Sequence, residues 1–199
     1  ESALESVLKN NNLDFEINPA DAAFYGPKLD FYVRDSLNRE HQCATVQLDF
    51  QLPERFDLTY TSASGIPERP VVIHRALYGS FERFMGLIIE HYAGAFPVWL
   101  APTQCTVMTI SERFVGYAEE VYQLLKSQEV RTELNDQDNK IGAKIRQARL
   151  ERVPYMLIIG EREQTNRTVA IRSREEGDLG SMDLSAAVEK LVAESNLDF

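Results

Sequence analysis

The stretch that decides the fold of the first half is RPVVIHRALYGSFERFMGLIIEHYAGAFP, from Arg69 to Pro97. Val71 to Ile73 are β-branched and predict a buried strand that leads into His74. Gly79 then opens a strongly apolar helix that carries Arg83 in its first turns. A guanidinium at the start of a helix is well placed to hold an anion. The segment therefore predicts a strand-helix unit with an anion contact.

Spacing alone leaves two interpretations of this unit open. Arg83 either pairs with a carboxylate such as Asp49 or Glu82, or it grips a phosphate, whose oxygens match its planar donors. His74 is either a hydrogen-bonded core residue or a metal ligand, and the first is the commoner role for a lone histidine at the end of an apolar strand.

A second metal candidate is the His-x-Cys pair of His41 and Cys43. In an unbroken strand these two side chains share one face, and Gln42 points to the other. Zinc needs three or four convergent ligands, and the sequence offers no second cluster. The pair by itself therefore does not predict a zinc site.

The composition is that of an ordinary globular protein, with 44% hydrophobic and 26% charged residues in 199. No apolar run reaches the roughly 18 residues of a membrane span, so no membrane partner is expected. Cys43 and Cys105 are far apart and predict no disulfide framework, which makes a reducing cytoplasm the default location.

The formal net charge of −10 argues against binding a polyanion over the whole surface. One segment, residues 140–152, is nevertheless basic. Its cations are Lys140, Lys144, Arg146, Arg149 and Arg152. They form either a solvated helix face or a local patch for a polyanion, and composition alone favours the first.

The pattern of predicted elements changes at Gly94–Pro97 and divides the chain into residues 1–96 and 97–199. The first half combines a helix within 2–12 and short strands at 15–17 and 58–60 with an antiparallel pair at 29–34 and 45–50. The second half alternates strands and helices, which predicts a small α/β domain with a mixed, mostly parallel sheet. Its expected strands lie in 98–110, 130–134, 155–159 and 168–172, and its helices in 111–128, 140–151 and 184–195.

Seven segments occur in an order that is far more specific than the composition. They are AFYGPKLDF (23–31), HQCATVQLDFQLPERFDLTY (41–60), RPVVIHRALYGSFERF (69–84), FPVWLAP (96–102), KIGAKIR (140–146), RVPYMLIIGERE (152–163) and DLGSM (178–182). Together they resemble the C-terminal part of the threonyl-tRNA synthetases, a family of class II aminoacyl-tRNA synthetases. The resemblance implies an α+β and α/β chain, in which the C-terminal half of a class II antiparallel-sheet catalytic domain precedes an anticodon-binding domain.

The resemblance implies roles for residues of the first half. IHRALYGSFERF is similar to motif 3 of the class, so Arg83 would contact the ATP phosphates and Lys28 would lie near the reacting groups, as catalytic residues. His74 matches the third protein ligand of a zinc ion that binds the amino and hydroxyl groups of threonine. The positions that match the substrate pocket are Tyr25, Gln42, Cys43, Thr45, Gln47 and Ser80.

In the second half the resemblance implies contacts with the tRNA anticodon. The matching positions are Asn139, Lys140, Arg146, Glu163 and Arg172. The chain departs from the family at Asp138, where an asparagine is usual, and Asn139 stands one position later. A carboxylate that faces a base or phosphate would be unfavourable.

The expected function is that of a threonine–tRNA ligase, which activates threonine with ATP and Mg²⁺ and transfers it to tRNA-Thr. The family's motifs 1 and 2 and its other zinc ligands lie upstream of the matching region, so residues 1–199 are expected to be a fragment without activity of its own. The full-length enzyme would be a homodimer. The alternatives are a non-enzymatic tRNA-binding module and a synthetase paralogue.

Overall fold

A computed structural model describes residues 1–19 and 21–196 of the chain. The chain folds into two compact units, residues 1–88 and 89–199, which are described one at a time. The point of division falls within helix α3 (Phe81–Tyr92). The domain boundary predicted between residues 96 and 97 stays a prediction.

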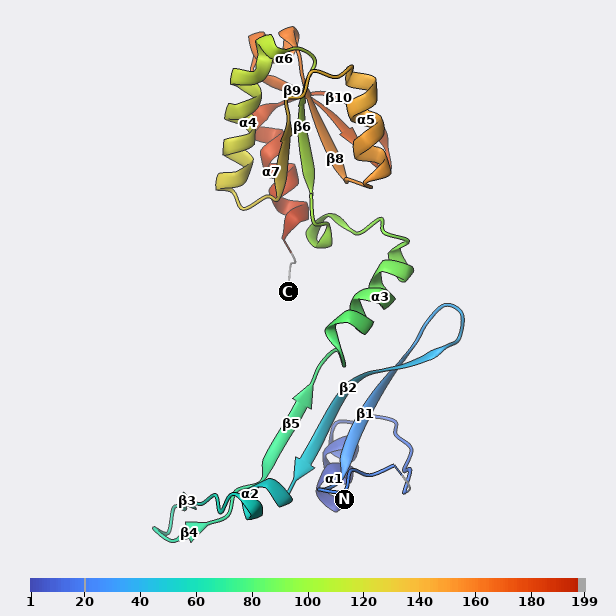
Figure 1. The fold of residues 1–199 in the computed structure, drawn as a ribbon, viewed down its shortest axis with the longest axis vertical. Coiled ribbons are helices and arrows are strands. Elements are labelled where there is room, and N and C mark those ends of the chain that lie inside the picture. The colour runs from blue at the N-terminus through green and yellow to red at the C-terminus, as the bar shows by residue number, and fades with distance from the viewer. Residues whose placement is uncertain (20, 197–199) are drawn as a thin grey trace. The chain divides into compact units, whose positions relative to one another are not determined.

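The first unit is built on a three-stranded antiparallel sheet in the order β1-β2-β5 (Figure 1). Its strands are β1 (Lys28–Arg34), β2 (Glu40–Asp49) and β5 (Val72–Ala76), and helix α1 (Ser2–Asn10) precedes them. The turn between β1 and β2 is closed by the Asp35 carboxylate, which accepts the backbone N–H groups of Leu37 and Arg39 at 2.9 and 2.8 Å. The predicted hairpin and N-terminal helix are confirmed.

Other details of the first unit differ from the prediction. The strand predicted at 15–17 is wrong, because these residues form no ladder with a neighbouring strand. A short helix α2 (Gln51–Arg55) and strand β4 (Pro67–Glu68) were not foreseen. Strand β4 pairs with β3 (Tyr60–Thr61), which overlaps the strand expected at 58–60 only at its last residue. Strand β5 starts at Val72 and continues to Ala76, so His74 lies inside the strand rather than after it.

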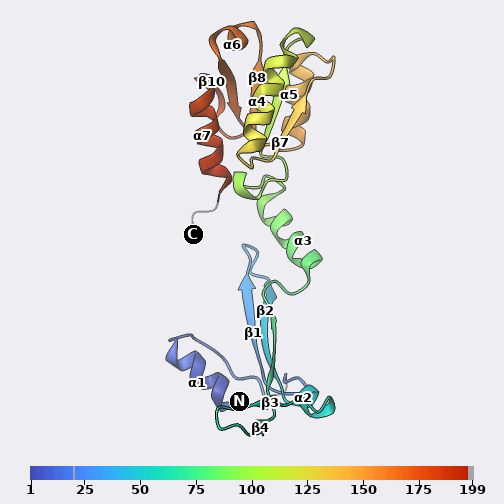
Figure 2. The same ribbon diagram turned by 90° about the vertical axis from the view of Figure 1, so that its left-hand side faces the viewer.

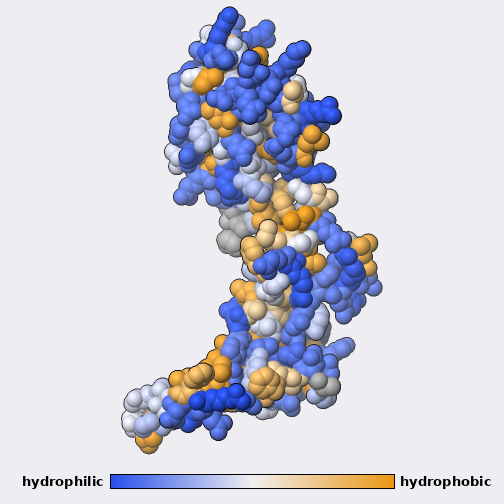
Figure 3. Space-filling view, viewed as in Figure 1, coloured by the Kyte–Doolittle hydropathy of each residue, from blue (hydrophilic) through white to orange (hydrophobic). Residues whose placement is uncertain are grey.

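The two faces of this sheet differ in chemistry because side chains alternate along each strand. One face carries Lys28, Gln47 and His74, and the other carries apolar residues such as Val33 and Ile73. Val33 is 56% exposed and Ile73 62%. Figure 3 shows apolar side chains on the surface of this unit. Its apolar face is therefore left largely uncovered by the residues that the structure describes.

The second unit contains a five-stranded mixed sheet in the order β10-β9-β8-β6-β7. Strands β7, β6 and β8 are parallel, and β9 runs antiparallel to both β8 and β10. The mixed α/β architecture is therefore confirmed. The strands are β6 (Cys105–Thr109), β7 (Thr132–Asn135), β8 (Tyr155–Ile159), β9 (Thr168–Ser173) and β10 (Gly177–Asp183). The helical segments are η1 (Val98–Leu100), η2 (Glu112–Phe114), α4 (Val115–Ser127), α5 (Ile141–Leu150), α6 (Glu161–Asn166) and α7 (Leu184–Ser195).

Strand β10 and helix α6 were not predicted. Strand β10 lacks apolar alternation, since it contains Gly177 and Gly180, and its pairing with β9 is interrupted between Asp178 and Gly180. Helix α6 is only six residues long, which is too short for a periodic apolar pattern to appear.

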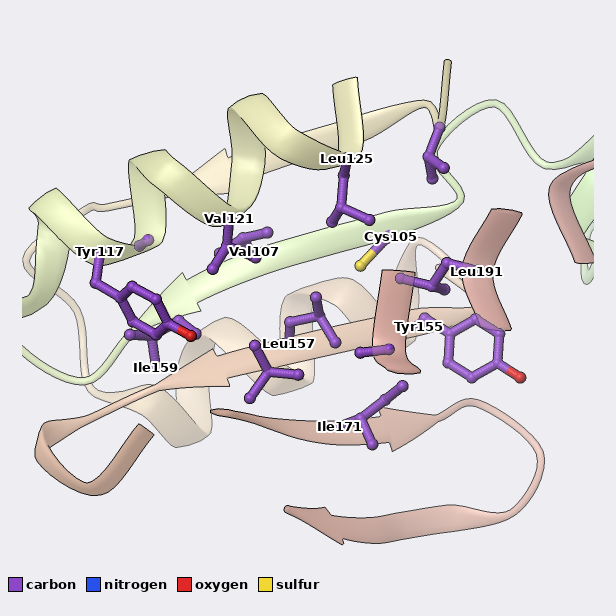
Figure 4. Close-up of a cluster of buried hydrophobic side chains, with 14 residues drawn as sticks. Cys105, Val107, Tyr117, Val121, Leu125, Tyr155, Leu157, Ile159, Ile171 and Leu191 are labelled. Atoms are coloured by element: carbon purple, nitrogen blue, oxygen red, sulfur yellow. The ribbon is translucent and has the colours of Figure 1, made fainter. Parts of the chain in front are cut away.

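Helices cover both faces of this sheet (Figures 1 and 2). Helices α4 and α7 pack on one face, where Val107, Leu157 and Ile159 meet Val121 and Leu191 in the main core (Figure 4). These five side chains are fully buried. Helix α5 packs on the opposite face through a smaller cluster made of Met108, Ala148, Val153 and Met156. The second unit thus has a closed hydrophobic core of its own.

A buried lysine attaches α5 to the sheet. Lys144 is only 3% exposed, and its Nζ donates to the backbone carbonyls of Thr109, at 3.0 Å, and Asn135, at 3.1 Å. These two residues end β6 and β7. Burial lowers the pKa of Lys144, although Asp136 and Asp138 oppose that shift. One of the five cations of the basic segment is therefore structural and is not presented to a polyanion.

Replacing Lys144 with Met should destabilise the second unit by about 1–3 kcal/mol, because two buried carbonyls lose their donor. Urea unfolding followed by circular dichroism measures this loss. Lys126→Met, at an exposed position of α4, should change stability by less than about 0.5 kcal/mol. Equal effects of the two substitutions would contradict the structural role of Lys144.

Candidate functional site

Three strands of the first unit bring Lys28, Gln47 and His74 into one row. Gln47 of β2 lies opposite Lys28 of β1 and also opposite His74 of β5. Directly paired residues of an antiparallel sheet point to the same face. The hydroxyl of Tyr25 donates to Oε1 of Gln47 at 2.6 Å. Four of the predicted site residues are therefore neighbours.

Tyr25 reaches this row because the next residue is a glycine. A Cβ at Gly26 would lie 2.0 Å from the carbonyl oxygen of Leu48, so only glycine lets the segment come this close to β2. Backbone hydrogen bonds hold it there, from Leu48 N–H to the Pro27 carbonyl and from Phe50 N–H to that of Tyr25. The motif FYGPK thus has a steric reason for its glycine.

Lys28 is held by two carboxylates on the same face. Its Nζ lies 2.7 Å from Oδ2 of Asp30 and 3.2 Å from Oδ1 of Asp21. The hydrogen bond with Asp30 raises the pKa of Lys28. Burial alone would raise the pKa of Asp30, but the Lys28 ammonium, the Thr45 hydroxyl and the Gln42 amide outweigh burial and lower it. Lys28 is therefore a firmly positioned cation.

The register of β2 explains how Gln42 joins this face. Phe31 pairs with Ala44 but Tyr32 pairs with Gln42, so Cys43 is the extra residue of a bulge. Nε2 of Gln42 donates to Oδ1 of Asp30 at 2.7 Å. The strict alternation expected across His41, Gln42 and Cys43 is wrong, because the bulge changes the face to which Gln42 points.

Arg83 binds neither Asp49 nor Glu82 among the interactions that the structure describes. Its guanidinium donates to the backbone carbonyl of Gln42, at the bulge. The Ser80 hydroxyl accepts the Arg83 backbone N–H at 3.2 Å and so caps helix α3. No described carboxylate neutralises the guanidinium, which leaves its charge available to an anion.

His74 has a buried carboxylate as its partner. Its Nε2 lies 2.9 Å from Oδ2 of Asp49, which is 2% exposed. Because an ionised carboxylate only accepts hydrogen bonds, this contact needs the proton on Nε2, and in the neutral ring Nδ1 is then the nitrogen with the lone pair. Carboxylates orient metal-binding histidines in this way. The residues that the structure describes contain no group of three or more His, Cys, Asp or Glu side chains that could hold a metal ion.

Asp30 and Asp49 orient the site and were missed in the sequence. The available signal was their spacing, since Asp30 is two residues from Lys28 and Asp49 two residues from Gln47. Residues two apart in a strand share a face. Thr45 lies opposite Asp30 in the neighbouring row.

In the second unit the predicted RNA contacts are distributed around α5. Lys140 is the N-cap of α5, and Arg146 is exposed within it. Neither side chain makes an ion pair with a residue that the structure describes. Asn139 is also exposed, and its amide donates to Oε1 of Gln137 at 3.1 Å.

Arg172 and Glu163 occupy better-defined positions. Arg172 of β9 pairs with Met156 of β8, whose side chain packs under α5, so Arg172 lies on the same face of the sheet as that helix. It is half-buried, without an ion-pair partner in the described part of the chain. Oε2 of Glu163 accepts the backbone N–H of Gly160 at 3.0 Å, so one carboxylate oxygen is fixed and the other remains an acceptor.

Two family models match the chain. The model described as "tRNA synthetase class II core domain (G, H, P, S and T)" matches residues 3–92, and the "Anticodon binding domain" model matches residues 104–194. No helix among the described residues is long and apolar enough to cross a membrane.

Relatives are similar over almost the whole chain. The threonine–tRNA ligase of Caldanaerobacter subterraneus subsp. tengcongensis is 51% identical over 97% of the chain, and that of Acetivibrio thermocellus is 53% identical over 96%. The chain spans about 30% of the length of each relative. A solved structure described as the RNA binding domain of threonyl-tRNA synthetase from Cryptosporidium parvum Iowa II is 40% identical, with a TM-score of 0.87 over 99% of this chain and 50% of that one.

The His74–Asp49 pair predicts a specific titration. Burial alone would raise the pKa of Asp49, but the Leu52 N–H, the His74 ring and the Gln51 N–H lower it below its ordinary value. His74→Ala should therefore raise the Asp49 pKa, as followed by NMR of its carboxyl carbon. Since the folded pKa is the lower one, Asp49 stabilises the fold above about pH 4 and loses this effect as pH falls through the folded value.

The matched control is His41→Ala, which removes the imidazole that lies 3.1 Å from Asp35. It should leave the titration of Asp49 unchanged. An Asp49 carboxyl that titrates identically in wild type and His74→Ala would show that the pair does not form in solution.

Proposed function

Because the chain belongs to the threonyl-tRNA synthetases, whose C-terminal part it matches, we propose that it is part of an ATP-dependent threonine–tRNA ligase. It would provide one part of the aminoacylation site, together with the anticodon-binding domain. The observation that carries the catalytic half of this proposal is the environment of Arg83. Its guanidinium is anchored by a neutral carbonyl, at the edge of a polar face that also holds Lys28 and His74.

The chemistry assigned to Arg83 follows from charge. When the carboxylate of threonine attacks the α-phosphate of ATP, pyrophosphate leaves and negative charge is spread over the phosphate oxygens. A guanidinium that is already held in place stabilises this charge without having to reorganise. Mg²⁺ would neutralise further phosphate charge when bound with ATP. Tyr25, Gln42 and Gln47 are the hydrogen-bonding side chains that would orient the substrate beside it.

His74 would supply one ligand to zinc through Nδ1, because Asp49 holds the other ring nitrogen. When bound, the ion would supply the Lewis-acid chemistry that distinguishes the hydroxyl of threonine from the methyl group of valine, and His74 would orient it. A single histidine does not hold the ion, so the remaining ligands must come from a part of the enzyme outside residues 1–199. Cys43 and Thr45 would contribute to the wall of the pocket.

In the second unit we assign Lys140, Arg146 and Arg172 to contacts with the anticodon loop. Lysine and arginine bind the phosphates of RNA, and a carboxylate accepts from the amino groups of exposed bases. Glu163 suits the second role, because the Gly160 N–H fixes its orientation. Asn139 would add a hydrogen bond beside Asp138.

The first unit has the surface expected of a partial domain. Its apolar sheet face is exposed, and the relatives are more than three times as long as the matched region. We therefore assign catalysis to the longer enzyme. As a member of its family, this enzyme would be a homodimer. The two free cysteines support a location in the reducing cytoplasm. A tRNA-binding module or a paralogue without activity would share the RNA-binding surface but would not need Arg83.

The RNA-binding half is tested with the full 199-residue chain and the anticodon stem-loop of tRNA-Thr. Binding should weaken as salt rises, and Arg172→Ala should lower the affinity about tenfold and reduce the salt slope by about one. Lys126→Ala removes the same charge from α4, on the opposite face of the sheet, and should have little effect. Equal affinity for any RNA hairpin, in a filter-binding assay, would contradict anticodon recognition.

The catalytic half is tested in the full-length enzyme. Arg83→Ala should lower the rate of ATP–pyrophosphate exchange by roughly 10²–10³, the usual cost of removing one transition-state donor. Arg34→Ala breaks an exposed ion pair with Glu40 and should leave the exchange rate unchanged. A full-length Arg83→Ala enzyme with normal exchange would remove the catalytic role, whereas the binding of RNA by the second unit would be unaffected.

A further inference from the structure

A shallow hollow of about 340 Å³ lies on the outer side of helix α5. It is lined by Gly142, Ile145, Arg146, Arg149 and Leu150. The predicted anticodon contacts include only Arg146 from this set. The remaining residues have no role in the function described so far.

The lining combines positive charge with apolar surface. Arg146 and Arg149 are three residues apart, so their side chains emerge on the same side of the helix. Both are exposed, and neither guanidinium forms an ion pair or hydrogen bond with a residue that the structure describes. Leu150 beside them is 68% exposed. No carboxylate lines the hollow, although the chain as a whole carries a net charge of −10.

The shape of the hollow depends on a missing side chain and a fixed helix. Gly142 lies at one end, and a Cβ built there would meet no atom within 4 Å, so the space above it is open. The opposite side of α5 is held to the sheet by Lys144 and by the small cluster around Ala148. The hollow is therefore a preformed feature of the helix surface.

We propose that this hollow binds one unpaired nucleotide of single-stranded RNA, next to the anticodon contacts of Lys140 and Arg146. The base lies against the exposed side chain of Leu150, and its phosphate lies between the two guanidinium groups. This inference rests on the proposed function and adds a nucleotide subsite to it.

RNA fits the lining better than the other partners of the same charge. An unstacked base offers a flat apolar face, on which arginine also stacks, and each nucleotide carries one phosphate. The site is continuous with Arg146, which is already assigned to RNA. An acidic peptide would satisfy the two arginines but would leave the exposed Leu150 without a planar partner. Peptide binding is an outcome that the experiment separates.

The test measures the affinity of the full 199-residue chain for the anticodon stem-loop of tRNA-Thr across salt concentrations. Arg149→Ala should weaken binding about five- to tenfold and lower the salt slope by about one. Arg149→Lys should recover the salt slope but not the full affinity, because lysine lacks a planar group for stacking. Gly142→Leu should weaken binding to a similar extent without changing the salt slope, since it fills the hollow and removes no charge.

Two controls make the outcomes distinct. Gly142→Ala introduces a small side chain into open space and should retain most of the affinity, while Lys126→Ala removes a charge from α4 and should have no effect. If Arg172→Ala impairs binding but Arg149→Ala and Gly142→Leu do not, the nucleotide subsite is wrong and the proposed function stands. If the wild-type chain does not bind the stem-loop, both are wrong. If Gly142→Leu impairs only the binding of an acidic peptide, the hollow belongs to a protein partner and the subsite is wrong.

Discussion

The pairing register of strand β2 is the constraint on which the candidate catalytic site depends. This strand is hydrogen-bonded on both sides, and each residue that it presents to the polar face is opposite a partner from β1 or β5. A slip of one residue would send Gln47 and Asp49 to the apolar face, away from Tyr25 and His74. The bulge at Cys43 interrupts the alternation of side chains along β2. It adds Gln42 to the polar face and brings its carbonyl to Arg83.

The elements of this fold were predictable where the sequence has a clear period, and the contacts of the site were predictable only in part. The β1–β2 hairpin and the longer helices of the second unit, α4, α5 and α7, follow from alternation, turn residues and helical spacing. The bulge could not be foreseen, because it depends on which residues pair across two strands. The same reason hid the partner of His74, since Asp49 is far away in the sequence and meets it only through the register.

Basic residues that are close together in the sequence have opposite roles. Lys144 and Arg146 are two residues apart in one helix, yet one is buried under the carbonyls of Thr109 and Asn135 and the other is exposed. Their separation on a helix is about 200°, which places them on opposite sides. A count of cations in the segment therefore overstates the charge available to RNA. Conversely, the attachment of Lys144 keeps Arg146 and Arg149 in a fixed place.

The distribution of burial gives the two units different degrees of independence. The second unit encloses residues from three strands and two helices in its main core, and its charged groups can serve recognition without carrying the fold. In the first unit Asp49 is among the few buried residues, and exposed apolar side chains surround a polar face whose own hydrogen bonds are well made. A sheet with one satisfied polar face and one bare apolar face gains stability when further chain covers the apolar side. The polar face would then stay in place as the covering chain forms, since Tyr25, Gln47, Lys28 and Asp30 already hold one another. We therefore expect RNA binding and catalysis to separate. The RNA contacts proposed for the second unit need only its own core, whereas the role proposed for Arg83 needs the rest of the enzyme around it.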